Sequence, residues 1–451
     1  MLPLIPMESV PSPNPALIHG LEDRPPAAAA ALAAFQQVLA MAVGTVTPPL
    51  LLAGSLGFSA PDTAHLVSVA LLASALGTWL QIRRRGPLGS GLLSVTGTSF
   101  SFVGPLQEAF KLGGFGLMTS MGLVAAPLQL LLAPFLPRLR RVFRPEVTGV
   151  VVLLIGLSLV PTAMFGVGSR LSGHSQSVSL AVAALVVGVS VACQVAGPKW
   201  LRLGAILAGI AAGCAACAFL GAIRVPETGS LPWLEFPRPM KWGFQVQARS
   251  LIPFLFIYLV SMLEAMGDMT ATARLSGLGT DGPDFWKRLR GGVMADSLTS
   301  IASGLFGGLP NTTYAQNNSV IQVTGVASRR VGYWMAGFLA IAGLFPAVAA
   351  WISVLPGPVL GGLALLLFGM VAAAGLRLIA AAGLDSRTMI LVGVSLGVGL
   401  GMASAPELSA SLPFLLRSLF ESPISGGGLT AMVLGLVLPG RSTESDSTAG
   451  E

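Results

Sequence analysis

Two carboxylates lie four residues apart inside the apolar stretch LIPFLFIYLVSMLEAMGDM, at Glu264 and Asp268, and a third, Asp296, follows near the start of a later apolar stretch. A spacing of four places Glu264 and Asp268 on one face of a helix. Two such carboxylates repel each other in a low dielectric, and a carboxyl group that exchanges a proton near neutral pH is what proton coupling requires. Because ionisable side chains are costly in a bilayer, we predict a proton-coupling site at these three residues. Two structural roles stay open: a polar pair facing a neighbouring helix for Glu264 and Asp268, and a helix cap or a partner for arginine for Asp296.

A dense group of amide and hydroxyl side chains occurs in the stretch NTTYAQNNSVIQ, which contains Gln316 and Asn317. Amide side chains offer donors and acceptors together, which suits a neutral planar ligand edged with N–H and C=O groups. The alternative is hydrogen bonding between helices, a frequent use of Asn and Gln in membranes. Upstream, Phe102 could stack on a flat ring or serve as packing. Gln36 and Gln37 are adjacent in the first apolar stretch, so they point different ways and at least one faces the protein interior.

The composition excludes a soluble globular protein. Of the 451 residues, 53% are hydrophobic and only 10% are charged, whereas soluble domains carry about 25% charged residues. We count fourteen apolar segments, at about 27–54, 63–82, 89–106, 114–136, 146–165, 178–196, 201–222, 251–272, 292–307, 311–323, 331–350, 352–375, 389–403 and 426–438. The net charge of +7 is explained by arginines in the loops of one side, so we expect no nucleic-acid partner. The three cysteines lie in apolar runs, as small packing residues, and we expect no metal site.

The loop charges predict the orientation of the chain. If the amino terminus is cytoplasmic and the segments alternate, most of the 26 Lys and Arg side chains fall inside, which also places the carboxyl terminus in the cytoplasm. The long connection near the middle divides the chain into two halves of seven segments, so the second half enters from the opposite side. This is the pattern of an inverted repeat. We therefore divide the chain into a flexible tail at 1–26, a first repeat at 27–225, an extracellular connection at 226–250, a second repeat at 251–440 and a second tail at 441–451.

The third segment of each half is unusually polar and rich in β-type residues, in SVTGTSFSFVGPL and LPNTTYAQNNSVI. Extended backbone at membrane depth is tolerated only where it is paired and buried in protein. We therefore expect a short strand in each of segments three and ten, paired with each other at a binding site. The expected fold class is an all-α polytopic membrane protein with these two short strands.

Four stretches of the sequence resemble a known family. These stretches are FQQVLAMAVG, GSGLLSVTGTSFSFVGPL, EAMGDMTATA and NTTYAQNNSVIQVTGVASRRVG. The family that they resemble is the nucleobase–ascorbate transporters, or nucleobase:cation symporter-2 proteins, and among them the bacterial xanthine/uric acid permeases. The tenth-segment signature, Gln/Glu/Pro-Asn-x-Gly-x-x-x-x-Thr, is met by Gln316, Asn317 and Thr324. The resemblance implies an inverted seven-plus-seven fold, with a core domain of segments 1–4 and 8–11 and a gate domain of segments 5–7 and 12–14.

The resemblance also implies roles for individual residues. Substrate binding would fall to Glu264, Gln316, Phe102, Ala315, Ser101 and Asn317; proton coupling to Glu264, Asp268 and Asp296; and support of the pocket to Gln36, Gln37, Thr98 and Asn311. In this family, the position that Gln316 occupies holds Gln in purine transporters and Glu in uracil transporters. The chain departs from the pattern at Gln37, where His is common, and at Ser319, where the motif has Gly.

The expected function is uptake of an oxopurine, xanthine or uric acid, across the bacterial inner membrane by an elevator-like motion of the core domain against the gate domains of a homodimer. The co-transported ion is expected to be a proton rather than sodium, with no cofactor. A uracil symporter and an anion transporter of the same fold are the alternatives. An intramembrane enzyme ranks last, because neither a Ser–His pair nor a metal cluster occurs at membrane depth in the sequence.

Overall fold

The computed structural model describes residues 17–139, 144–198, 201, 204–223, 234, 236–280, 282–353, 355–405, 407–408, 411–420 and 422–438. Its elements in chain order are α1 (Ala27–Leu56), α2 (Ala60–Ile82), β1 (Thr96–Thr98), η1 (Phe100–Phe102), α3 (Val103–Ala125), α4 (Pro127–Leu132), η2 (Ala133–Phe135), α5 (Leu136–Leu139), α6 (Pro145–Val167), α7 (Gln176–Ala196), α9 (Ala205–Phe219), α10 (Ala248–Leu275), α11 (Gly282–Leu305), β2 (Asn311–Thr313), α12 (Gln316–Thr324), α13 (Arg329–Leu344), α14 (Pro346–Ser353), α15 (Gly357–Ala382), α16 (Ser386–Ser404), α18 (Phe414–Phe420) and α19 (Pro423–Val437).

Among the described residues, eight helical stretches are long and apolar enough to cross a membrane. They are α1, α2, the run from η1 to α5, most of α6, and α7, α10, α15 and α16. Two shorter apolar helices, α9 and α19, accompany them. The expectation of a multi-pass membrane protein is confirmed, and the number of fourteen spans stays a prediction.

The two strands are short, fully buried and paired antiparallel. Thr96 lies opposite Thr313, Gly97 opposite Thr312 and Thr98 opposite Asn311. They fall in the two polar stretches, one in each half of the sequence. Each strand leads within a few residues into a helix, β1 into η1 and α3, and β2 into α12. Because no backbone group can stay unpaired away from water, the strands satisfy each other at the centre of the helices.

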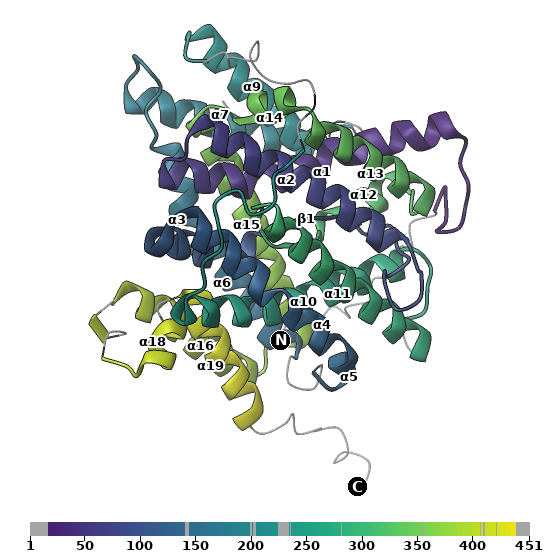
Figure 1. Cartoon of the computed structure of the whole chain (residues 1–451), viewed down its shortest axis with the longest axis vertical. Coiled ribbons are helices and arrows are strands. Elements are labelled where there is room, and N and C mark those ends of the chain that lie inside the picture. The colour runs from purple at the N-terminus through teal and green to yellow at the C-terminus, as the bar shows by residue number, and fades with distance from the viewer. Residues whose placement is uncertain are drawn as a thin grey trace, which may run out of the picture.

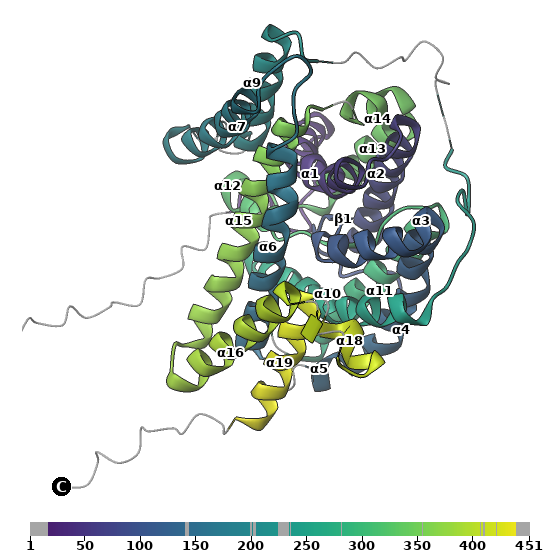
Figure 2. The same ribbon diagram turned by 90° about the vertical axis from the view of Figure 1, so that its left-hand side faces the viewer.

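The helices form two groups, which Figure 1 and Figure 2 show from two sides. One group surrounds the strands, with α2 packed against α13 and α11, and α10 packed against α3. In the other, α6 and α15 run side by side; α7 and α9 lie near one end of this pair, and α16 and α19 near the other. Within α3 the backbone is non-helical at Gly113 and Gly114, so α3 is two helical stretches joined by a break.

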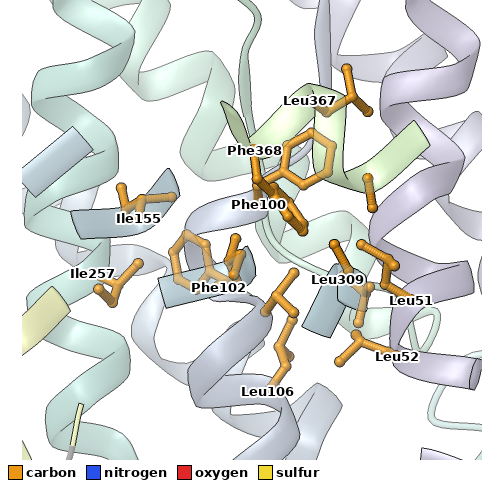
Figure 3. Packing of buried hydrophobic residues seen from close by; sticks show 14 of the residues in the cluster. Leu51, Leu52, Phe100, Phe102, Leu106, Ile155, Ile257, Leu309, Leu367 and Phe368 are labelled. Atoms are coloured by element: carbon orange, nitrogen blue, oxygen red, sulfur yellow. The ribbon is translucent and has the colours of Figure 1, made fainter. Parts of the chain in front are cut away.

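An apolar core joins the two groups. Figure 3 shows Phe100, Phe102, Leu106 and their neighbours beside Leu367 and Phe368 of α15. The rings of Phe100 and Phe368 meet edge to face, with 5.5 Å between their centroids. The η1 turn is thereby anchored in the contact between the strand-bearing group and α15.

The structure differs from the expected flexible tail at 1–26 in the second part of that tail, from residue 17 onward, which is held by backbone hydrogen bonds. The amides of Ile18 and His19 donate to the Gly325 carbonyl at 2.8 and 3.1 Å, and Ala327 N–H donates to the His19 carbonyl at 2.9 Å. This backbone pairing holds the segment before α1 against the turn between α12 and α13. Residues 1–16 and the expected second tail, 441–451, lie outside the described residues.

Candidate carboxylate and amide site

Helix α10 carries Glu264 and Asp268 one turn apart, and both side chains are partly exposed. The Ser101 hydroxyl, in the η1 turn that follows β1, donates to Glu264 Oε2 at 3.1 Å. Sequence reasoning placed Ser101 and Glu264 in the same site, and the structure brings them into contact. The hydrogen bond fixes the carboxylate relative to the strand pair, and among the described residues its second oxygen has no partner and can accept from a ligand.

A pair of hydrogen bonds sets the register between α10 and α12. The Thr272 hydroxyl lies 2.6 Å from Asn318 Oδ1, and Asn318 Nδ2 donates to the Asp268 carbonyl at 3.2 Å. The side-chain oxygen Oδ2 of Asp268 is buried and has no hydrogen-bond partner in the described part of the chain. Asn318 belongs to the polar stretch noted in the sequence, whereas Thr272 was not singled out there, and their spacing in the sequence gives no sign that they meet.

Asp296 lies in the interior of α11 and is only 1% exposed. Gln81 Nε2 donates to its Oδ1 at 2.8 Å, the Thr96 hydroxyl reaches the same atom at 3.5 Å, and Thr313 N–H donates to Oδ2 at 3.3 Å. Asp296 therefore joins α2 to both strands. The open alternatives of a helix cap or an arginine partner do not describe its place in the structure.

An ion pair secures the ends of α2 and α11 around this contact. Arg84 pairs with Asp284 in the first turn of α11, and Arg288 Nε lies 3.3 Å from Asp284 Oδ2. The Arg84 guanidinium beside Asp284 holds the pKa of that carboxyl below its usual range. These charges lie ahead of the apolar part of α11, so they orient the helix without entering the carboxylate site.

The start of α12 presents two amides in different surroundings. Gln316 is partly exposed, and within the described residues its side chain makes no hydrogen bond. Asn317 is 1% exposed and its Nδ2 donates to the Leu93 carbonyl at 2.6 Å. Ala315, at the N-cap, is exposed. Gln316 and the Ala315 backbone are therefore accessible to a ligand, whereas Asn317 braces the chain before β1.

The predicted stacking ring, Phe102, is packed into the core in this structure. Phe102 is completely buried, and its ring lies 4.5 Å from that of Tyr258 and 6.1 Å from that of Phe254. Its faces are covered by protein, so in this structure it does not offer a platform for a flat ligand. Phe100, two residues earlier, is 8% exposed, and its ring packs on that of Phe368.

The predicted supporting residues lie in or near the strands and α1. Thr98 and Asn311 are buried, the Thr98 carbonyl accepts from Tyr314 Oη at 2.8 Å, and Asn311 Nδ2 donates to the Leu309 carbonyl at 2.7 Å. Gln37 is fully buried and Gln36 is exposed, as their adjacency indicated. Within the described residues neither polar atom of the Gln37 side chain has a hydrogen-bond partner.

The site is acidic and uncompensated. In the described part of the chain, none of Glu264, Asp268 and Asp296 forms an ion pair with Lys or Arg. Carboxylates without cations repel an anionic ligand and favour one that presents N–H groups or carries a proton. The donors and acceptors of these side chains therefore suit a neutral hydrogen-bonding molecule better than an anion.

Comparison with known proteins also relates the chain to membrane transporters. A model of a permease family matches residues 28–408 of the chain. The chain is 42% identical over 438 residues to the xanthine permease XanQ of Escherichia coli (strain K12), covering 94% of each protein. It is 38% identical over 443 residues to the xanthine permease XanP of the same strain, covering 94% of this chain and 95% of XanP. A solved structure of the murine anion transporter Slc26a9 in its inward-facing state matches with a TM-score of 0.60 at 12% identity, covering 92% of this chain and 69% of that one, which concerns the fold alone.

Proposed function

Because the chain belongs to the nucleobase–ascorbate transporter family, the nucleobase:cation symporter-2 proteins, we propose that it imports an oxopurine, xanthine or uric acid, together with a proton. Its relatives XanQ and XanP are named xanthine permeases, and family members are permeases rather than enzymes. The finer claims, which are the choice of purine and the coupling to protons, depend on the site.

One observation carries the proposal: α10 bears a carboxylate held by Ser101, and the helix that α10 contacts, α12, begins with an amide that has no hydrogen-bond partner within the described residues. Glu264 presents a free acceptor oxygen on α10, and Gln316 presents a donor and an acceptor at the start of α12. The Thr272–Asn318 contact brings these two helices together. An oxopurine has ring N–H donors beside carbonyl acceptors, so it can donate to Glu264 and make a two-point contact with Gln316.

Proton coupling is assigned to Glu264, Asp268 and Asp296. An ionised Glu264 can accept ring N–H groups at both carboxylate oxygens, whereas protonation turns one of these oxygens into a donor, so its protonation state and substrate binding depend on each other. Asp268 has a buried oxygen without a partner among the described residues, which is a place where a proton can reside. Asp296 transmits a change at the strands to α2, because it is hydrogen-bonded to both. Phe102, the predicted stacking ring, supports this site from the core, where it packs against Tyr258 of α10.

The transport cycle requires an architecture that we infer from both halves of the sequence. Fourteen spans would form an inverted seven-plus-seven repeat, with both termini in the cytoplasm and the protein in the bacterial inner membrane. Antiparallel pairing of β1 from one half with β2 from the other is what two oppositely oriented repeats require. The core domain, segments 1–4 and 8–11, would move against gate domains of segments 5–7 and 12–14 that form a homodimer.

An anion transporter is the rival that the fold favours, because Slc26a9 shares it. The uncompensated carboxylates argue against an anionic substrate. A uracil symporter keeps the family and changes the ligand, and Gln316 argues against it through the family pattern in which Glu goes with uracil.

The test is uptake of labelled xanthine by cells that express the protein, with and without an uncoupler, and with unlabelled uric acid, guanine, hypoxanthine or uracil as competitors. Glu264→Gln is the variant, and Glu407→Gln, which removes an exposed carboxylate elsewhere, is its matched control. We expect uptake to stop with the uncoupler and with Glu264→Gln, and to be blocked by uric acid but not by uracil. Strong competition by uracil would reject the purine assignment. Transport of chloride or bicarbonate by reconstituted protein that takes up no purine would reject the function while leaving the fold intact.

A further inference from the structure

A pocket lies where the segment before α1 meets the first turns of α13, apart from the carboxylate site. It is lined by residues 21–24 on one side and by Arg329, Arg330 and Tyr333 on the other. Figure 1 shows this purple segment beside α13. Arg329 N–H donates to the Leu21 carbonyl at 3.1 Å, and Leu21 is buried. The pocket is therefore built by two distant parts of the chain that are joined through their backbones.

The charges around this pocket do not balance. Arg329 pairs with Glu22, and Asp23 Oδ2 accepts the Gly20 amide at 2.7 Å. Arg24 and Arg330 are exposed, and in the described part of the chain neither forms an ion pair. Two guanidinium groups at one pocket without carboxylate partners favour an anion, and the planar fork of arginine matches a phosphate group.

The surroundings of the pocket are those of a membrane surface. Helix α1, a candidate span, begins at Ala27, directly after the pocket-lining segment. On α13, the spacing of Arg330, Trp334, Phe338 and Ile341 places them along one face. Trp334 and Ile341 are 40% and 56% exposed, and the ring of Phe338 lies 6.0 Å from that of Phe35 on α1. An exposed arginine at the end of an exposed apolar stripe, with aromatic residues between, is the arrangement expected at a lipid–water interface.

We propose that this pocket binds the headgroup phosphate of an anionic phospholipid, with the acyl chains along the stripe of Trp334, Phe338 and Phe35. Arg24 and Arg330 hold the phosphate and Tyr333 lies at headgroup level. A free phosphate ion would meet the same two arginines, but it would gain nothing from the apolar stripe. The lipid is therefore the occupant that uses both halves of the site.

Occupancy of the site has a structural consequence at α12. The segment that carries Arg24 is hydrogen-bonded through Ile18 and His19 to the carbonyl of Gly325, the C-cap of α12. A lipid that bridges Arg24 and Arg330 stabilises this pairing. The amides of Ile18 and His19 then exchange more slowly with solvent when the lipid is bound.

The experiment uses the full-length protein in nanodiscs of phosphatidylcholine with increasing phosphatidylglycerol, and counts bound lipid by native mass spectrometry. The variant is Arg24→Gln/Arg330→Gln. The control is Arg274→Gln/Arg377→Gln, which removes two exposed arginines from other helices. Each arginine near an anionic lipid contributes roughly fivefold in affinity, so we expect about 25-fold weaker phosphatidylglycerol binding in the variant and less than twofold in the control. An equal loss in both would mean a diffuse charge effect and would overturn the site.

A second arm separates lipid from free phosphate. Hydrogen exchange at Ile18 and His19 is measured in detergent with phosphatidylglycerol, with glycerol 3-phosphate or with inorganic phosphate. We expect only phosphatidylglycerol, and neither glycerol 3-phosphate nor inorganic phosphate, to slow hydrogen exchange at these amides. We also expect the lipid to slow exchange less in Trp334→Ala. Equal protection by inorganic phosphate, or no effect of Trp334→Ala, would replace the lipid site with a simple anion site. Neither arm depends on the transported substrate, so the result stands apart from the proposed function.

Discussion

Gln81 Nε2 donates a hydrogen bond to Asp296 Oδ1 at 2.8 Å, deep between α2 and α11. Gln81 also donates to the Gly292 carbonyl at 2.9 Å, so one amide group ties the carboxylate and the backbone of α11 to α2. Asp296 in turn accepts the Thr313 amide of β2. The position of the strand pair in the helical bundle therefore depends on a buried amide–carboxylate contact.

The first prediction concerns that contact. Among the described residues, Gln81→Leu leaves Asp296 Oδ1 with only the distant Thr96 hydroxyl, so a buried carboxylate loses its main donor. We expect the unfolding free energy to fall by about 3 kcal/mol and transport to be lost, as measured by thermal unfolding in detergent and by uptake. Gln129→Leu is the matched control, because Gln129 is equally buried but donates to the neutral carbonyl of Tyr258 at 3.1 Å. Equal losses in the two variants would show that the charge of Asp296 does not matter.

The second prediction compares adjacent amides of α12. Gln316→Ala removes a side chain without a hydrogen bond in the described structure, so stability should change by less than about 0.5 kcal/mol while the KM for xanthine rises about tenfold. Asn317→Ala leaves the Leu93 carbonyl without its donor and should cost about 1–3 kcal/mol of stability. Thermal unfolding and uptake kinetics measure both. A stability loss in Gln316→Ala as large as in Asn317→Ala would place Gln316 in the core instead of the pocket.

The third prediction concerns the support of Glu264. Ser101→Ala removes the only hydrogen bond to its carboxylate within the described structure, so the carboxylate is less well oriented. We expect the KM for xanthine to rise about three- to tenfold, as measured by uptake, because a typical hydrogen bond contributes about 1 kcal/mol. Ser99→Ala is the control, since Ser99 is buried and its hydroxyl has no partner among the described residues. A similar rise in KM for Ser99→Ala would point to a general disturbance of the turn.

The fourth prediction concerns the close approach at β1. A Cβ at Gly97 would lie 2.6 Å from the Thr45 hydroxyl and from the ring of Tyr314, inside contact distance. We expect Gly97→Ala to lower the unfolding free energy by about 1–3 kcal/mol in a thermal unfolding assay. Gly104→Ala should not lower it, because nothing lies within 4 Å of the corresponding Cβ. A stable Gly97→Ala protein with normal uptake would mean that α1 and the strand pair can separate more easily than this packing indicates.

The sequence by itself determined that this is a multi-pass membrane protein and which family it belongs to. Both follow from local information, since the lengths of apolar runs and the spacing of polar residues such as Glu264, Asp268, Gln316 and Asn317 are visible along the chain. It also pointed to the two polar stretches in which the strands lie, because clusters of polar residues are unusual inside membrane segments and extended backbone there must be paired.

Only the tertiary structure decided which contacts each of these residues makes and which of them are buried. Gln81 meets Asp296, and Thr272 meets Asn318, across distances in sequence that no local pattern spans. Phe102 and Phe100 look equivalent in the sequence, yet Phe102 packs against Phe254 and Tyr258 of α10, whereas Phe100 packs against Phe368 of α15. The first 26 residues are polar and proline-rich as a whole, yet residues 17–24 among them are held in place because their backbone pairs with the turn after α12. Burial and pairing are properties of the assembled helices, which is why composition and spacing could not predict them.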